Sequence, residues 1–119
     1  MGIAMSKSYT GIVPLPGESL DDTYKVFSVS GDSMSPGIKP GALLLVKEIP
    51  RDEWGGVKGV AVFRTWKGAC IRRIGSNLID TERQISLIPD NPDYPAELLA
   101  SHEIRAVYKA IRKIHEYID

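Results

Sequence analysis

The stretch "VSGDSMSPGIKPGALLLV", Val29 to Val46, places a serine among turn-forming residues directly before an apolar run. Its glycines and prolines indicate a turn region, or at most one short helical turn, and "ALLLV" predicts a buried strand. Ser33 is either an ordinary turn residue, because serine bonds readily to nearby backbone N–H groups, or a nucleophile. The choice depends on whether the rest of the chain supplies a base.

The segments around this stretch predict a mostly β domain with antiparallel strands. "YKVFSVSG" alternates apolar and polar residues up to Gly31, "VAVFRTW" and "ACIRRIG" form a hairpin across a "KG" turn, and a further strand covers Ile85 to Ile88. "PRDEWGGVKG" is predicted to be a loop. Residues 1–24 contain prolines and an acidic cluster, so they are predicted as an extended arm with little regular structure, and residues 25–119 as the domain.

The C-terminal segment allows two interpretations. Its apolar residues fall at helical spacing, namely Ile104, Val107, Tyr108, Ile111 and Ile114. The stretch "AVYKAIRKI" also alternates as a strand would. Periodicity alone favours a helix.

Composition excludes several classes of protein. The chain has 119 residues, enough for one domain, and its 15 basic and 15 acidic residues cancel, which argues against direct DNA binding by this segment. Cys70 is the only cysteine, so an internal disulfide or a cysteine-based zinc site is excluded, and a reducing cytoplasm is the expected location. No apolar run approaches the roughly 20 residues of a membrane-spanning helix, and no secretory signal peptide is visible.

Familiar catalytic motifs are missing. "SGDSMSPG" lacks the lysine of a P-loop, and residue 35 is serine, so the segment is not a Gly-x-Ser-x-Gly nucleophile elbow. His102 and His115 stand in a charged setting and are expected on the surface rather than in a catalytic triad. No cofactor and no metal ion are expected.

Three segments, "GDSMSP", "IRRI" and "IPDNPDYP", give the chain its resemblance to a known family. In this order they resemble the LexA-like family, which comprises the C-terminal domains of LexA and phage repressors and the UmuD proteins, with signal peptidases as distant relatives on a related fold. The resemblance covers most of the chain and implies a coiled, antiparallel, mostly β domain. It also implies that Ala106 to Ile114 is a strand, often at a dimer interface, in place of the helix that periodicity favours.

The resemblance implies a serine–lysine peptidase site. Ser33 would be the nucleophile, and the substrate cleft around it would be formed by Gly31, Asp32, Met34 and Pro36. The base in such proteins is a lysine on the hairpin strand, kept neutral by burial. Here that position is taken by Arg72, in "IRRI". A guanidinium has a pKa of roughly 12 or above and only donors, so burial cannot convert it into a base.

No other lysine is expected to replace the missing base. Lys67 lies at the predicted hairpin turn, an odd number of residues from Arg72, so its side chain should point to the other face of the sheet. Lys39 and Lys47 flank the serine loop and are expected in solvent.

Arg72 itself is expected to act as a charged strut, paired with Asp32 or Glu53, while Met34 fills the core. Self-cleaving members of the family carry an Ala-Gly or Cys-Gly bond upstream of the serine, and none occurs here before Ser33. The cleavage segment is therefore expected either further upstream in a longer parent protein or not at all.

These features predict the C-terminal regulatory and dimerisation domain of a phage-type or stress-response (SOS) transcriptional repressor, with an inactive Ser/Lys site. The expected partner is a second copy of the chain, with DNA bound only through a separate N-terminal helix-turn-helix domain and no membrane contact. The alternative is an active serine self-peptidase of the LexA/UmuD type, whose lysine base lies elsewhere in the chain. Signal peptidase activity ranks third because no membrane anchor is encoded.

Overall fold

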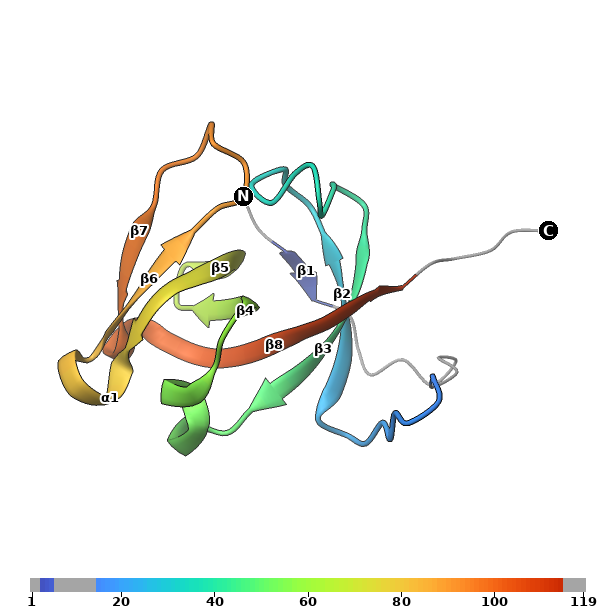
Figure 1. The fold of residues 1–119 in the computed structure, drawn as a ribbon, viewed down its shortest axis with the longest axis horizontal. Coiled ribbons are helices and arrows are strands. Elements are labelled where there is room, and N and C mark those ends of the chain that lie inside the picture. The colour runs from blue at the N-terminus through green and yellow to red at the C-terminus, as the bar shows by residue number, and fades with distance from the viewer. Residues whose placement is uncertain (1–2, 6–14, 115–119) are drawn as a thin grey trace.

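The computed structural model describes residues 3–5 and 15–114, which form one curled antiparallel sheet (Figure 1). The spatial order of its eight strands is β1-β2-β3-β8-β4-β5-β6-β7. The strands are β1 (Ile3–Met5), β2 (Tyr24–Val29), β3 (Leu43–Ile49), β4 (Val60–Thr65), β5 (Gly68–Leu78), β6 (Gln84–Ile88), β7 (Glu97–Ala100) and β8 (Ile104–Ile114). The mostly β class and the hairpin of β4 and β5 are as predicted.

Three short helical turns connect the strands: η1 (Arg51–Gly56), α1 (Ile79–Glu82) and η2 (Ser101–Glu103). The first lies in a segment predicted as a loop. It forms because Trp54 is buried under the sheet and its indole Nε1 donates to the Ile49 carbonyl oxygen at 3.0 Å. No helix of the described residues is long and apolar enough to cross a membrane.

The C-terminal segment is a strand, so the helix favoured by periodicity is wrong and the strand implied by the family resemblance is confirmed. β8 lies in the centre of the sheet, paired with β3 on one edge and with β4 on the other. A central strand buries side chains on both faces, which obscures the simple alternation of an exposed strand. Register shifts opposite Leu45/Val46 and Arg64/Thr65 obscure it further.

Two hydrophobic clusters pack against the sheet, and adjacent residues of β8 enter different ones: Tyr108 the first and Val107 the second. The first contains Phe27, Val29, Met34, Leu44, Val46, Val62, Ile71 and Tyr108. The second contains Trp54, Val57, Ala61, Phe63, Ile85, Leu87, Ile104 and Val107. The rings of Phe27 and Tyr108 meet edge to face, with their centroids 4.9 Å apart. The serine loop is anchored in the first cluster.

The N-terminal arm contributes more structure than its composition predicts. β1 pairs with the outer edge of β2, with Ile3 opposite Val29. Further along, Glu18 accepts hydrogen bonds from the Arg112 guanidinium at 2.9 and 3.0 Å. This ion pair fastens the segment before β2 to the end of β8.

Candidate functional site

The serine loop joins β2 to β3 and is closed at its base by backbone hydrogen bonds. The Val29 N–H donates to the Ala42 carbonyl oxygen at 2.9 Å, and the Gly41 N–H donates to the Val29 carbonyl oxygen at 2.7 Å. Inside the loop the Ile38 N–H donates to the Met34 carbonyl oxygen at 3.0 Å. This compact turn directs Ser33 inward, where it is only 1% exposed.

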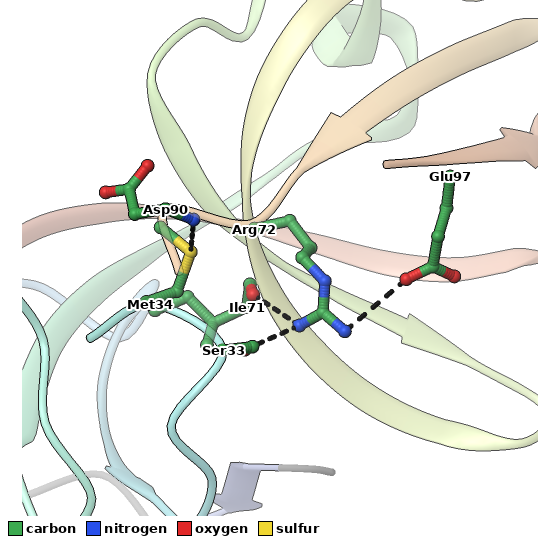
Figure 2. Close-up of polar contacts among 6 residues, drawn as sticks. All are labelled: Ser33, Met34, Ile71, Arg72, Asp90 and Glu97. Atoms are coloured by element: carbon green, nitrogen blue, oxygen red, sulfur yellow. Dashed lines mark hydrogen bonds and ion pairs between the residues drawn. The ribbon is translucent and has the colours of Figure 1, made fainter. Parts of the chain in front are cut away.

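Arg72 reaches Ser33 from β5, across 39 positions of the sequence (Figure 2). Its Nη1 donates to the Ser33 hydroxyl oxygen at 2.9 Å and to the Ile71 carbonyl oxygen at 2.7 Å. Its Nη2 lies 3.4 Å from a carboxylate oxygen of Glu97, at the start of β7. Arg72 is 6% exposed, whereas the side chain of Glu97 is 51% exposed. The cation is therefore buried, and its carboxylate partner stands half in water.

The geometry defines what this pair can do to a proton. The Ser33 oxygen receives a hydrogen bond from a permanent cation, which can orient the hydroxyl and stabilise negative charge beside it. A guanidinium has no lone pair with which to accept the hydroxyl proton. Among the described residues, the buried Nε of Arg72 also has no hydrogen-bond partner. An unpaired buried polar group lowers the stability of the fold. Stability alone therefore does not account for an arginine at position 72.

The segment "IPDNPDYP" holds the serine loop from the other side. The Asn91 N–H donates to the Ser33 carbonyl oxygen at 3.0 Å, and the Asn91 side-chain Nδ2 donates to the Asp32 carbonyl oxygen at 3.0 Å. The Tyr94 hydroxyl donates to the Asp32 carboxylate, and this bond raises the pKa of the Tyr94 phenol. Figure 2 shows a further link, from the Asp90 N–H to the Met34 sulfur, at 3.4 Å.

Sequence reasoning missed the roles of Glu97, Asn91 and Tyr94. The segment that carries Asn91 and Tyr94 was part of the family resemblance, and its Asn/Asp-rich turn was the one available signal. Nothing in the local pattern connects it with a loop about sixty positions earlier. The contacts arise because the sheet curls and brings the β6–β7 connection over the serine loop (Figure 1).

The expected ion pairs of Arg72 with Asp32 or Glu53 are wrong. The carboxylate beside Arg72 belongs to Glu97, while Asp32 bonds Tyr94. Glu53 lies on η1, at the exposed surface. The reason is topological, since β7 lies beyond β6 at the edge of the sheet and delivers Glu97 to the end of the guanidinium.

The residues expected to form a substrate cleft differ in burial. Gly31 is half-buried, and Asp32 and Pro36 are exposed. Met34 is fully buried within the first hydrophobic cluster, as expected of a core residue. The first three therefore surround the serine at the surface of the loop, and the methionine anchors the loop from below.

The lysines considered as substitutes for the base lie on the surface or against aromatic rings. Lys67 is exposed, with its Nζ 5.2 Å from the centre of the Trp66 ring, and Lys39 is exposed in the serine loop. Lys47 lies over the Tyr24 ring, 5.5 Å from its centre. Within the described part of the chain, no lysine amine hydrogen-bonds to the Ser33 hydroxyl.

The remaining candidates form no second centre in the residues that the structure describes. His102 is exposed on η2, and His115 lies outside the described residues. Residues 3–5 and 15–114 contain no group of three or more His, Cys, Asp or Glu side chains that could hold a metal ion. Burial raises the pKa of the Cys70 thiol on β5, which makes it a poor nucleophile.

Comparison with known proteins places the chain in a family. No curated protein matches it. The model of the family described as Peptidase S24-like matches residues 1–111, which include the serine loop, the hairpin that carries Arg72 and most of β8. The curled antiparallel sheet agrees with the fold of that family. The chain therefore belongs to the Peptidase S24-like family, that of LexA, UmuD and the phage-repressor C-terminal domains.

Proposed function

We infer that this domain is a non-catalytic regulatory and dimerisation module of a LexA-like or phage-repressor-like transcriptional regulator. The observation that carries the inference is the 2.9 Å hydrogen bond from the buried Arg72 guanidinium to the Ser33 hydroxyl. The guanidinium occupies the place where a serine peptidase of this kind requires a proton acceptor. Membership of the family accounts for the fold, and Arg72 at the lysine position leaves the Ser33 hydroxyl without a general base.

The size of the loss follows from general base catalysis. Removing a positioned base typically costs about 10²–10⁴-fold in rate. A guanidinium carries only hydrogen-bond donors, so it cannot act as the base in place of a lysine amine. The nearly complete burial of Ser33 adds a second obstacle, since a peptide carbonyl must reach its oxygen.

An uncovered strand edge supports the dimerisation role. β4 pairs with β8 from Ile104 to Lys109, and among the described residues no strand covers that edge from Ala110 to Ile114. Ile111 stands there 42% exposed. A free edge with an apolar side chain favours pairing with another extended strand. A second copy supplies such a strand, and the zero net charge assigns DNA binding to a separate domain.

The absence of catalysis is tested by comparing Arg72→Lys with its neighbour Arg73→Lys. The wild-type protein, incubated at alkaline pH, should give no Ser33-dependent fragments by mass spectrometry and no labelling by a fluorophosphonate. Arg72→Lys introduces an amine that burial can neutralise, so Ser33-dependent labelling should appear. Arg73→Lys makes the same substitution on the exposed side and should remain unlabelled. Self-cleavage or labelling of the wild-type protein that Ser33→Ala abolishes would establish the active self-peptidase instead.

Dimerisation is tested by sedimentation over a range of protein concentrations. Ile111→Glu should weaken the dimer, because it places a charge on the uncovered edge of β8. Ile88→Glu is the matched control, since Ile88 on β6 is 43% exposed, almost the same as Ile111. A wild-type protein that stays monomeric at high concentration would remove the dimerisation role.

A further inference from the structure

The β4–β5 hairpin presents a tryptophan to solvent at its turn. Trp66 is 65% exposed, whereas Trp54, the other tryptophan of the chain, is 4% exposed. The turn is closed by the Thr65 hydroxyl, which accepts from the Lys67 N–H at 3.2 Å and donates to the Gly68 carbonyl oxygen at 3.3 Å. A single exposed apolar side chain is common on protein surfaces. Trp66 is therefore informative only through the side chains around it.

Three cations surround Trp66. Arg64 and Lys67 flank it in the sequence, and the Lys67 Nζ lies 5.2 Å from the centre of the Trp66 ring. Arg105 comes from β8, where a register shift leaves it as the extra residue opposite the step from Arg64 to Thr65. All three cations are exposed, and together with Trp66 they form the hairpin tip.

The charges of the hairpin tip are not compensated within the part of the chain that the structure describes. None of its three cations belongs to an ion pair there. The Arg105 guanidinium donates to the neutral His102 carbonyl oxygen, at 3.4 Å. Glu103, the carboxylate nearest to Arg105 in the sequence, accepts from the Ala100 N–H at 3.3 Å instead. Three positive charges are thus gathered at one corner of a chain whose net charge is zero.

This combination of side chains favours a protein partner. Tryptophan and arginine are enriched among the residues that dominate the binding energy of protein interfaces. Nucleic-acid-binding domains usually carry a basic excess, which this chain lacks. Binding to a membrane surface scales with the apolar area that enters it, and Trp66 is the one exposed large apolar side chain of the turn. The cations select carboxylates, with which a guanidinium forms two parallel hydrogen bonds.

We propose that the hairpin tip binds an acidic segment of a partner protein. The Trp66 ring packs against an apolar side chain of that segment, and the carboxylates of the segment pair with Arg64, Lys67 and Arg105. The Thr65 hydrogen bonds already order the turn, so little conformational entropy is lost on binding. This surface is separate from the candidate site and from the uncovered end of β8.

The test is a calorimetric titration of the full chain, at low ionic strength, with the acetylated and amidated peptide Glu-Glu-Leu-Glu-Glu. Binding should saturate, and it should protect Trp66 from quenching by acrylamide. Arg64→Gln, Arg105→Gln and Trp66→Ser should each weaken binding about ten-fold, as the loss of one anchoring side chain does. An ionic strength of about 1 M should also weaken wild-type binding, because it screens charges beyond about 3 Å.

Two control variants match these substitutions. Leu98→Ser removes an apolar side chain that is 69% exposed, close to the 65% of Trp66. Lys39→Gln removes an exposed cation from the serine loop. Both variants should bind the peptide as the wild type does. All the substituted side chains are exposed, and circular dichroism confirms that each variant is folded.

Several results would overturn the proposal. These are the absence of saturable binding, equal binding of the peptide Gln-Gln-Leu-Gln-Gln, or an equal loss in Leu98→Ser. Single-stranded oligothymidylate that displaces the peptide through the same side chains would assign the tip to a nucleic acid instead. A shift of Trp66 emission on phosphatidylglycerol vesicles would assign it to a membrane surface. Loss of the dimer in Trp66→Ser, measured by sedimentation, would assign it to a second copy of the chain.

Discussion

Arg72 and Arg73 are adjacent on β5, and the sheet gives them opposite environments. Arg72 is buried, bonds to a hydroxyl and a carbonyl, and has only a long contact with Glu97. Arg73 is exposed and forms a two-pronged pair with Asp90 at 2.8 and 2.9 Å. Successive residues of a strand face opposite sides, so one arginine belongs to the interior and the other to the surface.

The difference shows that the geometry of an ion pair does not by itself indicate how much its cation contributes to the stability of the fold. The pair with ideal geometry lies in water, where such pairs contribute little. The cation with poor charge compensation lies in the interior, where its hydrogen bonds satisfy buried polar groups that water does not reach. The consequences of removing each side chain should therefore differ strongly.

The largest effect is expected for Arg72→Ala against Arg73→Ala. Arg72→Ala should lower the free energy of unfolding by about 2–3 kcal/mol, since it leaves a cavity and removes a donor from the buried Ser33 hydroxyl. Arg73→Ala should cost less than about 1 kcal/mol, as exposed ion pairs do. Urea denaturation of both variants measures the difference. Equal losses in the free energy of unfolding would contradict the expectation that the buried arginine contributes more to stability than the exposed one.

A smaller effect is expected where the serine loop is held from its other side. Asn91→Ala removes the amide that donates to the Asp32 carbonyl oxygen, so the free energy of unfolding should fall by about 1 kcal/mol. Hydrogen exchange of the amides from Asp32 to Ser35 should also become faster, because the loop loses a tether. Asp93→Ala, an exposed position in the same segment, serves as the control. Unchanged exchange in Asn91→Ala would show that Arg72 alone positions Ser33.

The smallest effect is expected for Asp90→Asn, and it depends on pH. The Arg73 hydrogen bonds hold the pKa of Asp90 below its usual value of 3.8, so the carboxylate favours the folded state. The stabilisation is fully present above that usual value and is lost as pH falls through the lower folded pKa. The difference in the free energy of unfolding between wild type and Asp90→Asn, measured by urea denaturation and below about 1 kcal/mol, should therefore vanish at strongly acidic pH. A difference that grows on acidification would contradict the ion pair.

Local patterns predicted the elements that depend on neighbouring residues. The turn residues around Ser33 and the hairpin of β4 and β5 were found because glycine, proline and alternation act over a few positions. β8 could not be settled in this way. Val107 and Tyr108 are adjacent and both buried, which fits one face of a helix as well as a strand with a core on each face. Only the pairing with β3 and β4 decides between the two.

The sequence by itself determined the proton chemistry of residues 33 and 72, because a hydroxyl and a guanidinium keep their donors and acceptors in any fold. It also determined the family, through motifs in three segments. Only the tertiary structure decided that these two side chains meet at 2.9 Å in the interior and that Glu97 stands beside them. Burial and proximity depend on how distant strands curl into one sheet, and no short stretch of sequence contains that information.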